Sequence, residues 1–294
     1  MTGVRMEGLR SDDPPRIGGY VTLGRLGPPE DARCDRRYLA RGADGRHTAV
    51  VSLPPPGADP ARWAAEAQWA QRLAQPGFWQ VAEIGGTPAF PWHASPYRPV
   101  LPLPAALAAY GGPLPEPVVR TLGATLAEAL ASAHVLGLAH GGLSPAAVLL
   151  TAYGPLLGCF GAARAAAPEG VARSGLPGLD PGCLAPEQAV GGPVAPAGDV
   201  YALGAVLAYA ATGHTVPERE EIPGGLRDLV SACLSRDPGN RPDPARVPGA
   251  LAPQAAYGAL TAATEPVSWP GPVVAALAAQ SAGLLAADLS TGER

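Results

Sequence analysis

The sequence contains no lysine. All 21 of its basic residues are arginine, so any mechanism that depends on a lysine amine is excluded. Asparagine occurs only once, at Asn240. Acidic residues number 25, which gives a net charge of −4, whereas nucleic-acid binding depends on clustered cations. The composition therefore argues against a nucleic-acid partner.

Apolar segments long enough to cross a membrane are also absent. Residues 1–16 lack the apolar stretch of a signal peptide. The longest late apolar run, residues 272–287, contains Gln280 and Ser281 and is too short and too polar to span a bilayer. We expect a cytoplasmic protein with no membrane span.

Cysteine is scarce and widely spaced. The four cysteines form no C-x-x-C pair and have no histidines at metal-ligand spacing. They are Cys34, Cys159, Cys183 and Cys233. Disulfide frameworks are typical of short secreted chains. We therefore expect four reduced thiols, with Cys159 as a buried structural thiol rather than a redox or metal site.

The pattern of the chain divides it into a β-rich part and a helical part. Residues 1–16 are polar and predict a flexible N-terminal arm. Residues 17–100 predict a small β lobe with a hairpin turn at 43–45 and one helix that starts at Asp59. Residues 101–251 predict a mainly helical lobe, and residues 252–294 form an Ala/Pro-rich extension with one further helix at 272–287.

Within the helical part, two segments stand out. Residues 146–161 predict a pair of strands around a Tyr153-Gly154 turn. Residues 165–198 are irregular and rich in glycine and proline, and loops of this length in a compact domain are usually functional or mobile. The almost wholly apolar residues 198–213 predict a buried helix.

Five ordered motifs resemble those of the bacterial, eukaryotic-like Ser/Thr protein kinases. They are LAHGGLSPAAVLL (138–150), GCFGAAR (158–164), LAPEQ (184–188), GDVYALGAVLAYAATG (198–213) and LSRDPGNRP (234–242). The resemblance covers residues 19–251. It implies an α+β, two-lobed protein-kinase-like fold with a small β lobe carrying one helix and a larger helical lobe.

The resemblance also implies where the chemistry of the family would lie. Kinases use a glycine loop, a strand lysine, a base and metal ligands to transfer phosphate. The strand lysine, the base, a phosphate-contacting lysine and the two metal ligands match Val51, Gly142, Ser144, Ala147 and Cys159. None of these residues has the side chain that the family uses at the matching position. Magnesium prefers oxygen ligands, so we expect no metal and no intact catalytic site.

The glycine loop is altered as well. It would follow Gly27, where Pro28 and Pro29 remove two backbone amides that could bind phosphate. Arg33, Arg36 and Arg37 alternate there with acidic residues, as in a solvated loop. Ser174 is the only phosphorylatable hydroxyl between Cys159 and Glu187, and the chain before residue 224 is too short for the family's docking helix.

Positions with a structural role in the family are kept. Those that would form a residual pocket are Gly27, Glu66, Tyr97, His140, Phe160 and Gly161. Glu187 and Arg241 match a buried ion pair, and Asp199 matches the aspartate that holds the catalytic loop. Glu66 loses its lysine partner, so we expect it to turn outward. The aromatic residues on or just after the small-lobe helix are expected in the core, and an exposed subset of them would form a partner patch; they are Trp63, Trp69, Phe78 and Trp79.

These positions predict a pseudokinase, a non-catalytic regulatory module. Its partner would be another protein, such as an active kinase or a signalling complex. No cofactor is expected, with ATP left open. The alternative is a divergent Ser/Thr kinase or ATP-binding phosphotransferase with a nonstandard site. A third interpretation is a hydrolase with Ser144, Asp199 and His214. It fits less well, because residues 142–146 lack the final glycine of the G-x-S-x-G motif that surrounds a hydrolase nucleophile. The composition is typical of an actinomycete.

Overall fold

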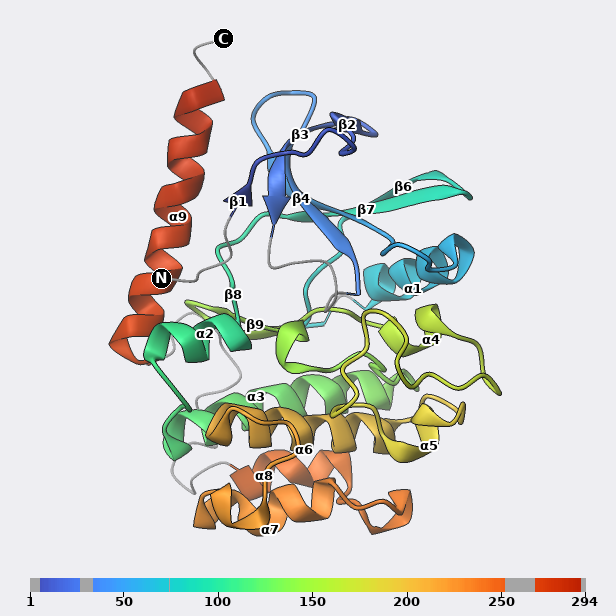
Figure 1. The fold of residues 1–294 in the computed structure, drawn as a ribbon, viewed down its shortest axis with the longest axis vertical. Helices are drawn as coiled ribbons and strands as arrows, with labels where there is room; N and C mark the ends of the chain where they lie inside the picture. Colours follow the sequence, from blue (N-terminus) through green and yellow to red (C-terminus); the bar gives the residue numbers. More distant parts are fainter. Residues whose placement is uncertain (1–5, 27–33, 74, 252–267, 292–294) are drawn as a thin grey trace.

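A sheet-based small lobe lies above a helical large lobe, and a linker at residues 97–100 connects them (Figure 1). The computed structural model describes residues 6–26, 34–73, 75–251 and 268–291. Among these residues, no helix combines the length and the apolar character needed to cross a membrane.

The small lobe is built on one antiparallel sheet. Its strand order is β1-β3-β4-β5-β7-β6, and β2 pairs with β3 beside this path. The strands are β1 (Met6–Glu7), β2 (Arg16–Ile17), β3 (Tyr20–Leu26), β4 (Arg36–Arg41), β5 (Thr48–Leu53), β6 (Glu83–Thr87) and β7 (Phe90–Pro96). The predicted turn at 43–45 connects β4 to β5, with Gly45 at a φ of +68°.

The single helix of this lobe, α1 (Pro60–Arg72), begins where the sequence predicts. The Asp59 carboxylate accepts hydrogen bonds from the amides of Ala61 and Arg62, which otherwise lack partners in the first turn. Trp63 is buried and stacks on His93 of β7, with 5.0 Å between the ring centroids. Trp69 is 44% exposed, so the prediction that it lies in the core is wrong.

The large lobe contains the remaining helices and a short sheet. Its helices are α2 (Leu103–Tyr110), α3 (Glu116–Val135), α4 (Ala162–Ala166), α5 (Pro186–Ala189), α6 (Pro196–Thr212), α7 (Gly224–Cys233), α8 (Val247–Leu251) and α9 (Gly271–Thr291). The sheet has the order β10-β9-β8. Its strands are β8 (Leu101–Pro102), β9 (Val148–Thr151) and β10 (Gly154–Leu157), so the predicted strand pair is confirmed.

The core of the large lobe centres on α6, which lies between α3 and α7 (Figure 1). Its apolar side chains are buried on every face, among them Leu203, Val206 and Leu207, as its composition predicts. Between α6 and α7 the described chain forms only a 3-10 turn, Arg219–Glu221. This agrees with the prediction that the segment is too short for a docking helix.

The N-terminal segment is not a free arm from residue 6 onward. Strand β1 pairs with β3, and Asp13 accepts hydrogen bonds from Arg25 Nε and Nη2, each at 2.6 Å, and from the Tyr38 hydroxyl at 2.7 Å. The hydrogen bonds from Arg25 hold the pKa of Asp13 far below its usual range. The flexible-arm prediction is therefore wrong for residues 6–16, because a buried ion pair fixes them to the sheet.

The C-terminal extension belongs to the large lobe. Trp269 is buried, and its indole Nε1 donates a 2.7 Å hydrogen bond to the carbonyl of Thr151. Helix α9 covers the predicted helix and packs on α2 through Val273 and Leu277. Gln280 Oε1 accepts a 3.2 Å hydrogen bond from the amide of Val100 in the interlobe linker. The boundary predicted at residue 251 thus cuts through one packed unit.

The irregular stretch predicted at 165–198 is fixed by a buried arginine. The Arg173 side chain is 0% exposed and donates to four backbone carbonyls, those of Ala163, Ala167, Gln188 and Gly192. These carbonyls lie on both sides of the loop. A guanidinium offers five donors in a fixed plane, so one side chain organises a segment that has little regular structure.

Candidate functional site: the cleft between the lobes

The catalytic-loop segment is held in place by Asp199 of α6. Its carboxylate accepts hydrogen bonds from the amides of His140 at 2.7 Å and Gly141 at 2.8 Å, and it lies 2.8 Å from His134 Nε2. This is the role that the resemblance implies for Asp199. These contacts join Asp199 to the His134 ring and the loop backbone, a role different from that in the hydrolase triad considered above.

The His140 ring lies in an aromatic cluster beneath the small lobe. It is 0% exposed, with its centroid 6.0 Å from that of Phe78 and 5.7 Å from that of Phe160. Burial lowers the pKa of His140 to about 4, so the ring is neutral at physiological pH. Phe160 thus packs against the loop as the family pattern implies.

Gly142, at the position of the catalytic base, has no room for a side chain. A Cβ atom there would lie 2.0 Å from the carbonyl oxygen of Cys159 and 2.9 Å from the Ala162 Cβ. Contacts this short require the backbone to move. An aspartate therefore does not fit at this position in the present arrangement of the Cys159 segment.

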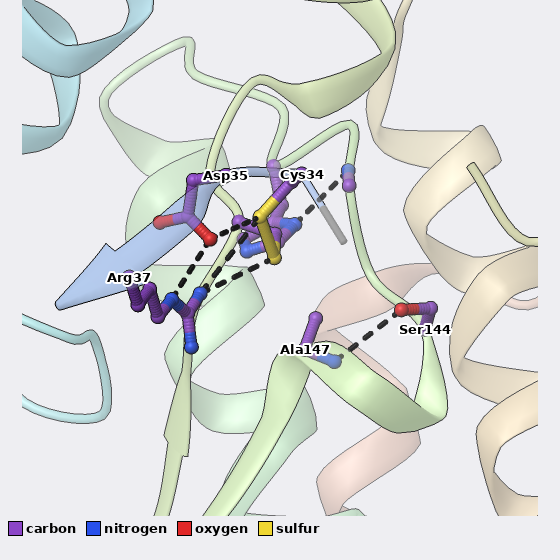
Figure 2. Close-up of a disulfide and its surroundings, with 8 residues drawn as sticks. Cys34, Asp35, Arg37, Ser144 and Ala147 are labelled. Carbon is purple, nitrogen blue, oxygen red and sulfur yellow. Dashed lines mark hydrogen bonds and ion pairs between the residues drawn. A yellow bond between two sulfur atoms is a disulfide. The ribbon is translucent and has the colours of Figure 1, made fainter. Parts of the chain in front are cut away.

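Ser144 and Ala147, at the positions where the resemblance implies a phosphate-contacting lysine and a metal ligand, form a local cap. The Ser144 hydroxyl accepts a 3.3 Å hydrogen bond from the Ala147 amide and caps a 3-10 turn, Pro145–Ala147 (Figure 2). The Ala147 methyl group is fully buried. Because Ala147 and Cys159 offer no oxygen ligand from their side chains, these positions do not fit Mg²⁺.

Cys159, at the position of the metal-binding aspartate, is joined to Cys34 by a disulfide (Figure 2). Their Cα atoms are 5.7 Å apart and 125 residues separate them in sequence. Cys34 lies two residues before β4 of the small lobe, so the bond crosses the cleft. The expectation of four reduced thiols is wrong for this pair, while Cys183 and Cys233 are free and buried. Spacing along the chain could not reveal a bond that depends on how the two lobes meet.

Asp35 and Arg37 form an ion pair beside the disulfide rather than a solvated loop. Arg37 Nε lies 2.8 Å from Asp35 Oδ1, and the two side chains are 17% and 7% exposed. Burial is the largest single influence and raises the pKa of Asp35, but the charges of Arg37 and His93 and the hydrogen bonds from Arg37 and Ser52 together outweigh it, so the pKa is lowered. Cys34, Asp35 and Cys159 bring ligand-type atoms within 4.8 Å of one another, yet both sulfurs and the carboxylate are already engaged.

Glu66 of α1 points into the cleft and has a partner. Arg164 of α4 donates to its carboxylate through Nε at 2.9 Å and through Nη2 at 2.8 Å. The expectation that Glu66 turns outward is therefore wrong, because an arginine from the large lobe replaces the missing lysine. Gly161, at a φ of +74°, makes room for this pair, since a Cβ there would lie 2.1 Å from Glu66 Oε2.

The strand position that faces the cleft is Ser52 rather than Val51. Ser52 pairs across the sheet with Arg37 and His93, and both of these line the interlobe cavity. Side chains alternate along a strand, and Val51 accordingly packs on the other face of the sheet with Tyr38. The sequence match that placed the strand lysine at Val51 is thus off by one residue.

A cavity remains between α1, β7 and the Cys159 segment. It has a volume of about 60 Å³ and is lined by the disulfide, Arg37, Glu66 and Phe160, among others. Small-molecule sites usually measure about 300 Å³ or more. Tyr97, also expected near the pocket, lies in the linker, where its amide donates to Thr48. Gly27 and Arg33 lie outside the described residues.

The arrangement of lobes defines a protein kinase fold. The kinase domain of PknI from Mycobacterium tuberculosis superposes on the chain with a TM-score of 0.64 and 23% identity, covering 80% of this chain and 95% of that one. No protein-family model matches the chain.

Curated relatives give the family. The serine/threonine-protein kinase AfsK of Streptomyces coelicolor is 34% identical over 83% of this chain, and the probable serine/threonine-protein kinase PkwA of Thermomonospora curvata is 35% identical over 82%. The chain belongs to the bacterial Ser/Thr protein kinase family. It spans 33% and 35% of the length of these two relatives.

Proposed function

We propose that the chain is a pseudokinase, a kinase-fold module that transfers no phosphate and acts by binding another protein, such as an active kinase. The observation that carries this proposal is the closure of the base position: the Cys159 carbonyl occupies the space of a side chain at Gly142. The residues at the metal positions and the absence of lysine support the same conclusion. In kinases these groups act as a unit, so losing all of them leaves little of the rate enhancement.

Thermal unfolding and phosphotransfer on the whole chain test the proposal together. We expect no labelling of a general protein substrate by ATP and Mg²⁺, and no stabilisation that depends on Mg²⁺. A ligand at 100 times its dissociation constant would stabilise the fold by about 2.7 kcal/mol. Phosphotransfer, or a Mg²⁺-dependent shift, would instead support the divergent phosphotransferase. A shift with ATP alone would be consistent with a nucleotide-sensing binding module.

A pair of glycine variants tests the closure itself. Gly142→Ala places a methyl group 2.0 Å from the Cys159 carbonyl, whereas Gly224→Ala meets no atom within 4 Å. We expect Gly142→Ala to lower the free energy of unfolding by about 2 kcal/mol or more and Gly224→Ala to change it by less than about 0.5 kcal/mol. Equal stabilities for the two variants would remove the main support for the proposal.

A further inference from the structure

The disulfide lies where the two lobes meet. Cys34 lies two residues before β4 in the small lobe, and Cys159 lies two residues after β10 in the large lobe. Both residues are partly exposed, which is the first condition for attack on the bond by a thiol from solution. A cross-link at this place limits how far the small lobe can move from the catalytic loop.

The side chains around the bond favour thiol–disulfide exchange. Arg37 Nη2 lies 3.8 Å from the Cys34 sulfur and 3.7 Å from the Cys159 sulfur. A neighbouring cation stabilises a thiolate, which speeds its departure when the bond is attacked. The Asp35 carboxylate is 3.5 Å from the Cys34 sulfur and forms an ion pair with Arg37, so it offsets part of the effect of this cation on Cys34. The other two cysteines differ, because burial raises the pKa of the Cys183 thiol and raises that of Cys233 to about 12.

Cys159 also has a backbone that the bond helps to hold. Its φ of +59° is the only positive value among the described non-glycine residues, in a region that side chains of L-residues rarely tolerate. The carbonyl oxygen of this residue fills the space next to Gly142. Release of Cys159 therefore gives the segment freedom to leave the catalytic loop.

We propose that Cys34 and Cys159 form a reversible thiol–disulfide switch that ties the lobes together when oxidised and frees the Cys159 segment when reduced. The reductant is a dithiol of the thioredoxin class. One of its thiolates attacks one sulfur, the S–S bond breaks, and the electron pair and a proton go to the other sulfur. Its second thiol then displaces the first cysteine as a thiol, which leaves an oxidised dithiol and two reduced cysteines. The oxidant for the reverse step is a low-molecular-weight disulfide such as oxidised glutathione, which accepts the two electrons and leaves as two thiols. The proposal does not depend on the absence of phosphotransfer.

Thiol counting in the native chain is the first test. After mild treatment with dithiothreitol and removal of the reagent, we expect alkylation at Cys34 and Cys159 and little at Cys183 or Cys233, mapped by mass spectrometry of peptides. Incubation with oxidised glutathione should re-form the bond. A bond that opens only on unfolding, or a pair that stays reduced under oxidised glutathione, would overturn the switch.

Hydrogen exchange tests whether the bond restrains the cleft. We expect amides of 157–166 and 34–41 to exchange faster in the reduced form, with α6 unchanged as an internal reference. Identical exchange in both forms would show that the bond restrains nothing and would overturn the proposal.

Neighbouring arginine variants test the role of Arg37. Arg37→Gln should slow reduction by dithiothreitol by about threefold or more. The matched Arg36→Gln, which loses a bond to the Pro54 carbonyl instead, should leave the rate unchanged. Equal rates for the two variants would overturn the assignment of Arg37 as the group that makes the bond exchangeable.

Discussion

Two arginine–carboxylate pairs hold this molecule together, and they differ in origin. Arg241 pairs with Glu187 inside the large lobe at 2.7 and 2.8 Å, as in the family pattern. Arg164 pairs with Glu66 across the cleft at 2.8 Å, where the family pattern has a lysine. The kinase framework thus persists in the large lobe, while the contacts between the lobes are rebuilt from arginine and cysteine.

The largest effect expected from this comparison concerns Arg241. Its side chain is 1% exposed, so Arg241→Met leaves Glu187 without its cation. We expect the free energy of unfolding in urea to fall by about 3 kcal/mol or more. Arg246→Met is the control, since that side chain is 87% exposed and 4.0 Å from Asp243. A loss below about 1 kcal/mol for Arg241→Met would show that the Glu187–Arg241 pair does not stabilise the large lobe.

Trp269 tests whether the framework extends past residue 251. It is 6% exposed, and Trp269→Ala should cost about 3 kcal/mol through the cavity and the lost hydrogen bond to Thr151. Trp69→Ala removes a tryptophan that is 44% exposed and should cost less than about 1 kcal/mol. Both values come from urea unfolding. Similar losses at the two sites would contradict the conclusion that the C-terminal extension is part of the large lobe.

The Cys34–Cys159 bond tests how much the contacts between the lobes contribute to stability. Cross-links that close long loops stabilise proteins by about 2–4 kcal/mol, and this one spans 125 residues. Cys34→Ser should lower the free energy of unfolding by roughly 3 kcal/mol under oxidising conditions. With dithiothreitol present, wild type and variant should converge. Cys183 lies outside the bond, so the difference in stability between wild type and Cys183→Ser should be the same with and without dithiothreitol.

The smallest effect is a dependence on pH. His140 has a pKa of about 4 in the fold, against about 6.5 when unfolded. The unfolded chain therefore binds a proton that the folded chain rejects, and stability falls as the pH drops from 6.5 to 4. We expect a loss of about 2 kcal/mol between pH 7 and 5. His140→Gln should remove this part of the loss and leave the part due to His93, whose pKa burial also lowers to about 4. His47→Gln, in a side chain that is 82% exposed, should leave the profile unchanged.

Most of the large-lobe framework could be predicted from the sequence, because its elements are encoded by motifs within single segments of the chain. The buried α6, the strand pair β9–β10 and the residues of the Glu187–Arg241 pair follow from apolar periodicity or from the family motifs. The start of α1 follows from the Asp59 cap. Each of these signals lies within one segment of the chain.

The cleft was harder to predict because its contacts join distant segments. Val51 and Ser52 differ by one residue, and a one-residue shift moves a side chain to the other face of a sheet. The partner of Glu66 could have been sought among the arginines once lysine was known to be absent, but Arg164 lies 98 residues away. For Cys34 and Cys159, sequence spacing carried no signal at all.

Two bodies joined at one flexible point can rotate in every direction, whereas a second joint leaves only rotation about the line between the joints. The linker at 97–100 is the first joint here, and the Cys34–Cys159 bond is the second. The Glu66–Arg164 pair adds a third restraint. In the oxidised form the small lobe is therefore left with no free rotation unless the ion pair opens. A partner whose binding depends on the relative orientation of the lobes would therefore bind one defined conformation.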